Sequence, residues 1–319
     1  MKILFVCHPY PNYVPDLLLH GLRTLMGTDV VDYPRKNCLY SGVIGLGICS
    51  DDLLCKGWFP EDAGRIDRDD IQSKLKNGFF DYVVCDLRAI SFLRSIVDQT
   101  SQKVVLIDGE DKPAYIPPGP YVVCRRETDG TDYSIPLPMA LPPYIFKWIS
   151  KYDHSEKRYS IGFLGSSGGD GQRKAIIDTI QETFPDSLLQ ATLVPSKAAP
   201  NPDGRLSRED YYRNLQQCKI VLSLSGEGHD TFRFWENAAV NAVHLSSQSP
   251  LFIPNDFQTD QEIVRFASIP QLKQIIETIL DHSDQYQSLA TRGRAKLLRY
   301  HMTQHRAEYF MDRIRIAFA

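Results

Sequence analysis

Short apolar runs rich in β-branched residues alternate with helix-like stretches along this sequence, and the alternation occurs twice. In the first half, strand-like runs stand at residues 3–7, 82–85, 104–107 and 121–124, with helix-like stretches among them. Strands that alternate with helices favour a parallel sheet covered by helices. The first half of the chain is therefore expected to fold as an α/β domain, although no element can be predicted between residues 34 and 70.

A Pro-rich passage at residues 135–146, followed by a polar run, interrupts the pattern and indicates a linker. The alternation then starts again with a strand-like run at residues 159–164 and a helix-like stretch at 172–184. A chain of 319 residues is also longer than one core usually serves. We expect an N-terminal domain over residues 1–148, a C-terminal domain over 149–300, and a helix over 301–319 that packs across both.

Two α/β units in series predict the fold class: two Rossmann-like, doubly wound domains. Ligands of such sheets bind beyond the carboxyl ends of the strands. The two domains are therefore expected to face a shared cleft that holds the site.

Charge and cysteine content limit the classes of partner and compartment. Thirty-six Lys and Arg against thirty-nine Asp and Glu give a net charge of -3, which argues against nucleic acid as a partner. The seven cysteines form no C-x-x-C pair, as expected of reduced thiols. The apolar run after Met1 is too short for a signal peptide or a transmembrane segment. These features predict a cytoplasmic protein, with peripheral attachment to a membrane left open.

The segment at residues 218–247 carries the clearest chemistry, because a strand leads through a Gly-containing loop into a helix that begins near Thr231. A helix N-terminus attracts anions through its free N–H groups and its dipole. Arg233 could add a bidentate contact to a diphosphate, and Glu236 could accept hydrogen bonds from two ribose hydroxyls. The alternative is structural: Asp230 or Thr231 caps the helix, and Arg233 forms a solvated ion pair. The donor-site candidates here are His229, Thr231, Arg233 and Glu236.

A second segment, at residues 161–180, joins a strand to a Gly-rich loop and then to a helix with Arg173 and Lys174 in its first turn. Glycines let backbone amides approach a phosphate, and the cations complete an anion site. The spacing fits neither a P-loop nor a dinucleotide fingerprint, which disfavours triphosphatases and dehydrogenases. A plain surface turn is the alternative. The donor-site candidates here are Gly165, Ser166, Ser167 and Arg173.

The Arg-Phe-Trp-Glu-Asn-Ala run at residues 233–238 resembles the C-terminal signature of GT-B glycosyltransferases of the exostosin-like and spore-maturation-protein-like groups. The resemblance implies that Glu236 holds the donor's ribose and that Arg233 lies near its diphosphate. Two further stretches resemble the same group, the Phe-x-Gly-Ser strand end at residues 163–166 and the Gly-Arg ending with its later Thr-x-His-Arg at residues 293–314.

The sequence departs from that group at two points. Gly228 stands where a Glu-x7-Glu arrangement of retaining enzymes would need a glutamate, which weakens a retaining assignment. Val240-Asn241-Ala242 replaces the usual Ala-x-Gly before the last strand, which puts the tightness of that turn in doubt.

Candidates for a catalytic base lie in the N-terminal half. Asp108 and Glu110 follow a strand-like run, where a carboxylate could take the proton of an acceptor hydroxyl. His8 and Asp16 are rival bases, while an acidic turn and a capping or packed histidine are the structural alternatives. No His or Cys spacing suggests a metal site, and no cofactor is expected.

These features predict a metal-independent glycosyltransferase that moves a sugar from a nucleotide-diphosphate donor to an acceptor hydroxyl. Inversion of the anomeric centre is preferred because it needs only one base. The acceptor, whether a saccharide, a lipid-linked saccharide or a protein, is left open. Two alternatives are a non-catalytic nucleotide-sugar-binding or scaffold protein of the same fold and a sugar-nucleotide epimerase.

Overall fold

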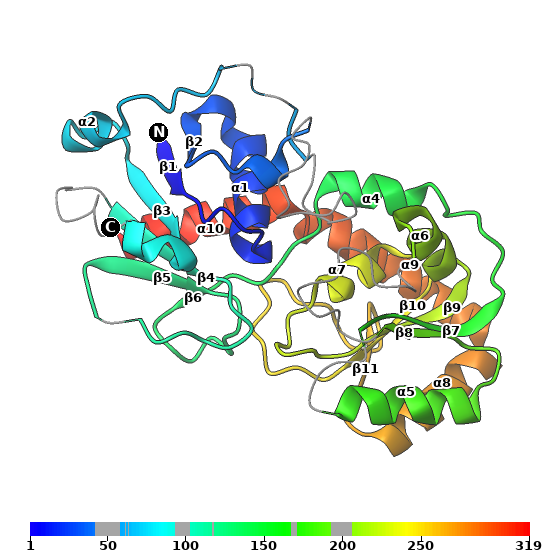
Figure 1. Ribbon diagram of the computed structural model, residues 1–319. Coiled ribbons are helices and arrows are strands. Elements are labelled where there is room, and N and C mark those ends of the chain that lie inside the picture. Colours follow the sequence, from blue (N-terminus) through cyan, green and yellow to red (C-terminus); the bar gives the residue numbers. More distant parts are fainter. Residues whose placement is uncertain are drawn as a thin grey trace. The chain divides into compact units, whose positions relative to one another are not determined.

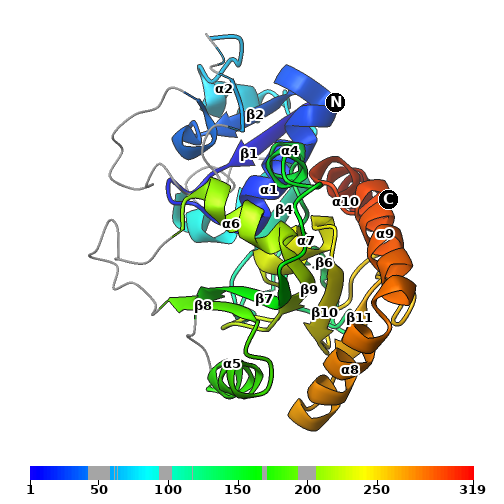
Figure 2. The same ribbon diagram turned by 90° about the vertical axis from the view of Figure 1, so that its right-hand side faces the viewer.

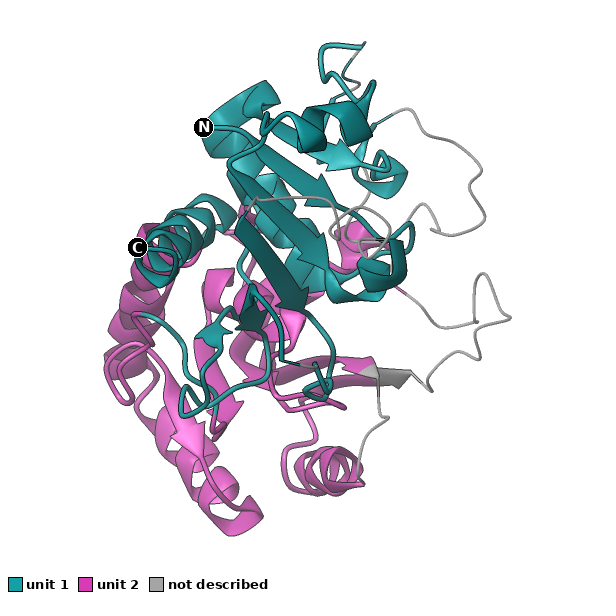
Figure 3. Cartoon of the chain, turned by 90° about the vertical axis from the view of Figure 1, so that its left-hand side faces the viewer, with its two compact units in different colours: residues 1–142, 251–254, 302–319 teal, residues 143–250, 255–301 magenta. Residues whose placement is uncertain are grey.

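The computed structural model describes residues 1–41, 58–60, 62, 64–92, 103–116, 118–166, 171–192 and 206–319. Within them the chain forms two compact units (Figure 3). Unit 1 comprises Met1–Pro142, Leu251–Pro254 and Met302–Ala319, and unit 2 comprises Pro143–Pro250 and Asn255–His301. The chain therefore crosses from unit 1 to unit 2 after Pro142 and ends in unit 1.

Unit 1 is built on one sheet whose six strands are all parallel. Their order is β2-β1-β3-β4-β5-β6, so the direction of winding reverses between β1 and β3. Such a reversal leaves a crevice at the carboxyl ends of the two strands, where ligands of doubly wound sheets bind. The strands are β1 (Ile3–Val6), β2 (Val30–Tyr33), β3 (Tyr82–Asp86), β4 (Lys103–Asp108), β5 (Tyr121–Arg125) and β6 (Ile135–Pro136).

Three α-helices of unit 1 are described: α1 (Tyr13–Met26), α2 (Ile71–Lys76) and α10 (Thr303–Ala317). Short 3₁₀ turns stand at Gly27–Asp29, Asn37–Leu39 and Leu87–Ala89. Helices α1 and α10 lie side by side although almost the whole chain separates them in sequence (Figure 1). They meet at Gly21, where an added Cβ atom would lie 2.1 Å from the carbonyl oxygen of Thr303 and 3.0 Å from the Cβ atom of Ala307.

Replacing Gly21 with alanine is expected to lower the free energy of unfolding by about 2 kcal/mol, because the new methyl group would have to push the α10 backbone away. In an unhindered helix the same substitution stabilises, by up to about 1 kcal/mol. Urea denaturation of the Gly21→Ala variant and of the unchanged protein therefore shows whether the substitution lowers or raises the free energy of unfolding. A Gly21→Ala variant as stable as the unchanged protein would contradict this close helix contact.

Unit 2 repeats the same arrangement with five parallel strands in the order β11-β10-β9-β7-β8. Its winding reverses between β7 and β9. The apolar side chains of the strands form a buried core with those of the covering helices, including Phe163, Leu222 and Ile276. The strands are β7 (Tyr159–Ser166), β8 (Leu188–Thr192), β9 (Cys218–Ser223), β10 (Val243–Ser247) and β11 (Val264–Phe266).

Helices cover both faces of the sheet in unit 2, with α5 and α8 on one face and α6 and α7 on the other (Figure 2). The helices are α4 (Pro143–Ser150), α5 (Gln172–Thr183), α6 (Arg208–Gln216), α7 (Phe232–Ala239), α8 (Ile269–Asp281) and α9 (Ser283–Tyr300). The predicted pair of Rossmann-like, doubly wound domains is thus confirmed. No helix among the described residues is both long and apolar enough to cross a bilayer.

Candidate functional site

Arg233 marks the point in unit 2 where the winding reverses. It lies in the first turn of α7, and its Nε atom donates a hydrogen bond to the carbonyl oxygen of Leu164 on β7 at 2.7 Å. Its guanidinium carbon is 5.1 Å from the centre of the Phe163 ring. A Cβ atom at Gly165 would lie 2.2 Å from an Nη atom of Arg233. The absence of a side chain at position 165 therefore leaves room for this guanidinium group at the end of β7.

Arg173 brings a second guanidinium group to the same place. It begins in the first turn of α5 and is buried, and it donates hydrogen bonds to the carbonyl oxygens of Leu224 at 3.2 Å and Ser225 at 2.6 Å. Its guanidinium carbon is 5.9 Å from the Phe163 ring, so the two arginines share this aromatic neighbour. Two positive charges thus converge on the carboxyl ends of β7 and β9, which is the part of such a sheet where anionic ligands bind.

Glu236 is buried one helical turn after Arg233. Its Oε1 atom accepts a hydrogen bond from the Tyr212 hydroxyl at 2.7 Å, and its Oε2 atom accepts one from the Tyr211 hydroxyl at 3.0 Å. Burial raises the pKa of Glu236, while the Tyr212 hydrogen bond, the charge of Arg233 and the Tyr211 hydrogen bond act against the rise. Glu236 is therefore a carboxylate in an apolar place whose ionised form is supported by polar neighbours.

The loop before α7 places the remaining donor-site candidates. Thr231 occupies the N-cap position of α7, and its side chain makes no capping hydrogen bond. Asp230 accepts a hydrogen bond from the indole nitrogen of Trp235 at 2.8 Å. The exposed His229 lies 3.2 Å from the Ser225 hydroxyl. The Thr231 side chain therefore does not compete with a ligand for the amides in the first turn of α7.

The Gly-rich loop after β7 can be followed only in part. Gly165 and the backbone of Ser166 complete β7. Ser167 lies outside the described residues, and so does the side chain of Ser166. Their predicted contacts with a donor stay predictions.

The candidate bases of unit 1 follow β1 and β4, and each has a partner. Asp108 is buried at the end of β4, where its two oxygens accept hydrogen bonds from the amides of Glu110 at 3.3 Å and Ala114 at 2.9 Å. Burial raises the pKa of Asp108, against the opposing effect of these amides. Glu110 forms a two-point ion pair with Arg88, at 2.5 and 3.3 Å.

His8 and Asp16 belong to the chain after β1. The Nδ1 atom of His8 accepts a hydrogen bond from the Tyr10 amide at 3.3 Å, and burial lowers the pKa of its ring. Asp16 pairs with the buried Lys36 at 2.8 Å, and burial raises the pKa of Asp16 to about 6 despite that partner. Lys36 also donates to the carbonyl oxygens of His8 and Tyr10, both at 2.7 Å. Asp16 therefore serves to hold the loop that carries His8.

Asp86 is a further buried acidic residue, which is not among the candidate bases predicted from the sequence. It ends β3 beside β1, where the winding of unit 1 reverses. Its Oδ1 atom accepts hydrogen bonds from the Arg88 amide at 3.1 Å and the Asn12 side chain at 3.4 Å, while Oδ2 is buried with no hydrogen-bond partner among the described residues. The signal that marks Asp108, a carboxylate closing an apolar run, is equally present at residues 82–86.

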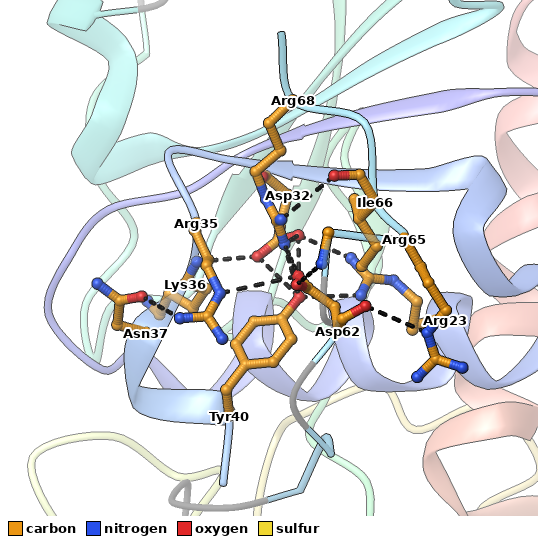
Figure 4. Close-up of polar contacts among 11 residues, drawn as sticks. Arg23, Asp32, Arg35, Lys36, Asn37, Tyr40, Asp62, Arg65, Ile66 and Arg68 are labelled. Carbon is orange, nitrogen blue, oxygen red and sulfur yellow. Dashed lines mark hydrogen bonds and ion pairs between the residues drawn. The ribbon is translucent and has the colours of Figure 1, made fainter. Parts of the chain in front are cut away.

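A buried ionic cluster surrounds Asp32, a residue of β2 (Figure 4). The carboxylate of Asp32 pairs with Arg23 at 2.8 Å and with Arg68 at 2.6 Å, and it accepts a hydrogen bond from the Tyr40 hydroxyl at 3.1 Å. Arg68 also pairs with Asp62 at 2.8 Å. Tyr40 and Asp62 stand on opposite sides of residues 42–57, which lie outside the described part of the chain. The cluster thus ties both flanks of that stretch to β2.

Metal ligands do not gather among the residues that the structure describes: no group of three or more His, Cys, Asp or Glu side chains is placed to hold an ion.

Comparisons of sequence and fold relate this chain to glycosyltransferases. Residues 188–312 match the family model described as glycosyl transferase-like. The fold resembles HepE of Anabaena, solved with UDP and glucose, at a TM-score of 0.58 and 10% identity over 98% of this chain and 99% of that one. It also resembles a glycosyltransferase of Rickettsia africae, at a TM-score of 0.61 and 10% identity over 98% and 97% of the two chains. Comparison with curated protein sequences finds no match.

At 10% identity, likeness to solved structures establishes the fold alone, and the family model covers less than half of the chain. Both findings nevertheless point the same way, and the family match includes α7 with Arg233 and Glu236. This chain therefore has the GT-B fold of glycosyltransferases, with two Rossmann-like domains, and carries a glycosyl transferase-like sequence over residues 188–312.

Proposed function

We propose that this protein is a glycosyltransferase that moves a sugar, most simply a hexose, from a UDP-sugar to an acceptor hydroxyl. The observation that carries the proposal is the convergence of Arg233 and Arg173 on the point of unit 2 where its winding reverses. A diphosphate is the anion that suits two guanidinium groups beside a helix N-terminus whose N-cap residue, Thr231, makes no side-chain cap. UDP is chosen because HepE, which shares the fold, was solved with UDP and glucose.

The donor would be held by residues from three elements of unit 2. Arg233 would face the diphosphate, Arg173 would add charge and hold the loop after β9, and Glu236 would accept hydrogen bonds from the ribose hydroxyls. Further contacts to the donor are proposed for Gly165, Ser166, Ser167, His229 and Thr231. The Arg-Phe-Trp-Glu-Asn-Ala run supports a relation to the exostosin-like and spore-maturation-protein-like groups.

Transfer would proceed with inversion and without a metal ion. A base takes the proton of the acceptor hydroxyl, the oxygen attacks the anomeric carbon, and the bond from that carbon to UDP breaks with its electron pair leaving on the phosphate. The arginines and the positive end of α7 would stabilise the charge that develops on UDP. We propose Asp108 as the base, since it ends a strand of unit 1 and burial raises its pKa towards the range useful for proton transfer.

Replacing Asp108 with asparagine is expected to reduce turnover by about 10²- to 10⁴-fold while leaving UDP affinity unchanged, because the substitution removes the base and keeps its shape. The assay is UDP release from UDP-glucose with a panel of saccharide acceptors. Glu110→Gln and His8→Asn serve as matched tests of the rival bases. Full activity in Asp108→Asn would contradict its role and leave the base to whichever rival variant is inactive.

The same assay separates the alternative functions. A sugar-nucleotide epimerase would convert the UDP-sugar without an acceptor and would release no UDP. A binding or scaffold protein would bind UDP and turn nothing over. Either result would overturn the proposed transfer reaction.

A further inference from the structure

Tyr211 and Tyr212 are consecutive residues of α6 whose hydroxyls both reach the same carboxylate. Successive residues of a helix point about 100° apart, so two neighbours meet one group only when it lies between their directions. Here the Tyr211 hydroxyl donates to one oxygen of Glu236 at 3.0 Å and the Tyr212 hydroxyl to the other at 2.7 Å. The two rings contact each other edge to face, with centroids 5.1 Å apart. The carboxylate of Glu236 is therefore fixed in both position and plane.

Glu236 also lies one helical turn after the arginine of the same helix. The positive charge of Arg233 opposes the rise in pKa that burial causes at Glu236 and at Tyr211, and Arg233 donates to Leu164 of β7 at 2.7 Å. The carboxylate held by the two tyrosines therefore belongs to the same helix as the guanidinium group proposed to face the diphosphate.

The hydrogen bonds from Tyr211 and Tyr212 do not use all the lone pairs of the Glu236 carboxylate. A carboxylate has about four lone-pair positions, and the tyrosines occupy one on each oxygen. A vicinal diol could use one further position on each oxygen. The charged or titratable groups that act on Glu236 are Tyr211, Tyr212 and Arg208 from α6 and Arg233 from α7.

We propose that Tyr211 and Tyr212 are positioning residues, which hold the ionised Glu236 so that it receives both ribose hydroxyls of the uridine nucleotide. The inference rests on the proposed function, because it assigns the partners of a residue in the same donor site. Loss of either hydroxyl removes a hydrogen bond that favours the carboxylate form, so the pKa of Glu236 would rise further above its ordinary value. Affinity for UDP would then be lost as pH falls through that raised pKa.

The test is calorimetric titration of the full chain with UDP and with its 2′-deoxy analogue, at pH 6 and at pH 8.5. The unchanged protein should bind UDP at least about tenfold more tightly than the deoxy analogue, as expected for one charge-assisted hydrogen bond. In Tyr212→Phe that preference should fall to about twofold or less, and the loss of UDP affinity should be larger at pH 6 than at pH 8.5. Glu236→Gln should abolish the preference at both pH values.

Tyr152→Phe is the matched control, because it removes a tyrosine hydroxyl from the same unit, where the ring lies against Arg213, and should behave as the unchanged protein. Tyr211→Phe removes the bond to the other oxygen and replaces Tyr212→Phe if the latter does not fold, as judged by thermal unfolding. An unchanged preference for UDP over the deoxy analogue in both Phe variants would overturn the positioning role and leave the donor site standing. Failure of the unchanged protein to bind UDP would overturn the proposed function, and this inference with it.

Discussion

Replacing Asp32 with asparagine is expected to lower the free energy of unfolding by about 3–5 kcal/mol, the cost typical of breaking a buried ion pair by removing one partner. Asp32 is fully buried, and the side chains of Arg23 and Arg68 are only 10% and 16% exposed. Asparagine keeps the shape but removes the negative charge that compensates Arg23, and it leaves Arg68 with Asp62 as its remaining ion-pair partner. The expected effect is large because the cost is the uncompensated charge rather than the lost hydrogen bonds.

Urea denaturation followed by far-ultraviolet circular dichroism measures this change. Asp29→Asn is the matched control in the same unit, since the ion pair of Asp29 with Lys2 is exposed on both sides and should contribute nothing measurable. An Asp32→Asn protein as stable as the control would contradict the description of the cluster in Figure 4 as a buried ionic anchor.

Replacing Arg233 with alanine is expected to weaken UDP binding by about 100-fold, which corresponds to about 2.7 kcal/mol and to one or two charge-assisted hydrogen bonds. Lysine at the same position should restore little of the UDP affinity, because an ammonium group lacks the planar guanidinium geometry that contacts a diphosphate at two points. The side chain also donates a hydrogen bond to Leu164, so its loss would disturb the neighbouring loop as well.

Isothermal titration with UDP checks this prediction. Arg158→Ala is the control, because Arg158 is exposed and lies just before β7, at the opposite end of that strand from Leu164. UDP affinity in Arg233→Ala equal to that of Arg158→Ala would contradict the placement of the diphosphate beside α7.

Much of the fold could be predicted from sequence because central strands such as β1, β3, β4 and β9 are buried on two faces and stand out as apolar runs. Strand β2 is not predicted because Asp32 interrupts its short apolar run. The tertiary contacts of Asp32 with Arg23 and Arg68 explain why a carboxylate can be buried there. The C-terminal helix is expected over residues 301–319, but the sequence does not indicate what separates it from the helix before it. The structure ends α9 at Tyr300 and begins α10 at Thr303, with the extended Met302 between them.

That break has a cause that local periodicity cannot reveal. Met302 forms a bridge with Leu141, and the Thr303 amide donates to the Leu141 carbonyl oxygen at 3.1 Å. The ring of His301 lies on Phe257, with centroids 4.8 Å apart. These partners lie 44 to 162 residues earlier in the chain, so the turn is determined by tertiary contacts rather than by the sequence of the helices.

The residues that face the ligand in the candidate site could be predicted from the sequence, but the contacts that hold them could not. Motif and spacing suffice to choose Arg233 and Glu236, because a helix that follows a strand and a glycine loop has an obvious ligand-facing end. The sequence gives no sign that Arg173 turns its N–H groups to the carbonyl oxygens of Leu224 and Ser225. Nor does it link the tyrosines of α6 to Glu236, since that contact depends on how two helices pack.

Sugar transfer is tested directly by incubating the protein with UDP-glucose, with and without saccharide acceptors, and measuring released UDP and the mass of the acceptor. We expect UDP release that depends on an acceptor, a glucosyl unit added to that acceptor, and loss of both in Arg233→Ala. A folded protein that neither binds UDP nor releases it with any acceptor would contradict the claim that this chain is a glycosyltransferase using a UDP-sugar.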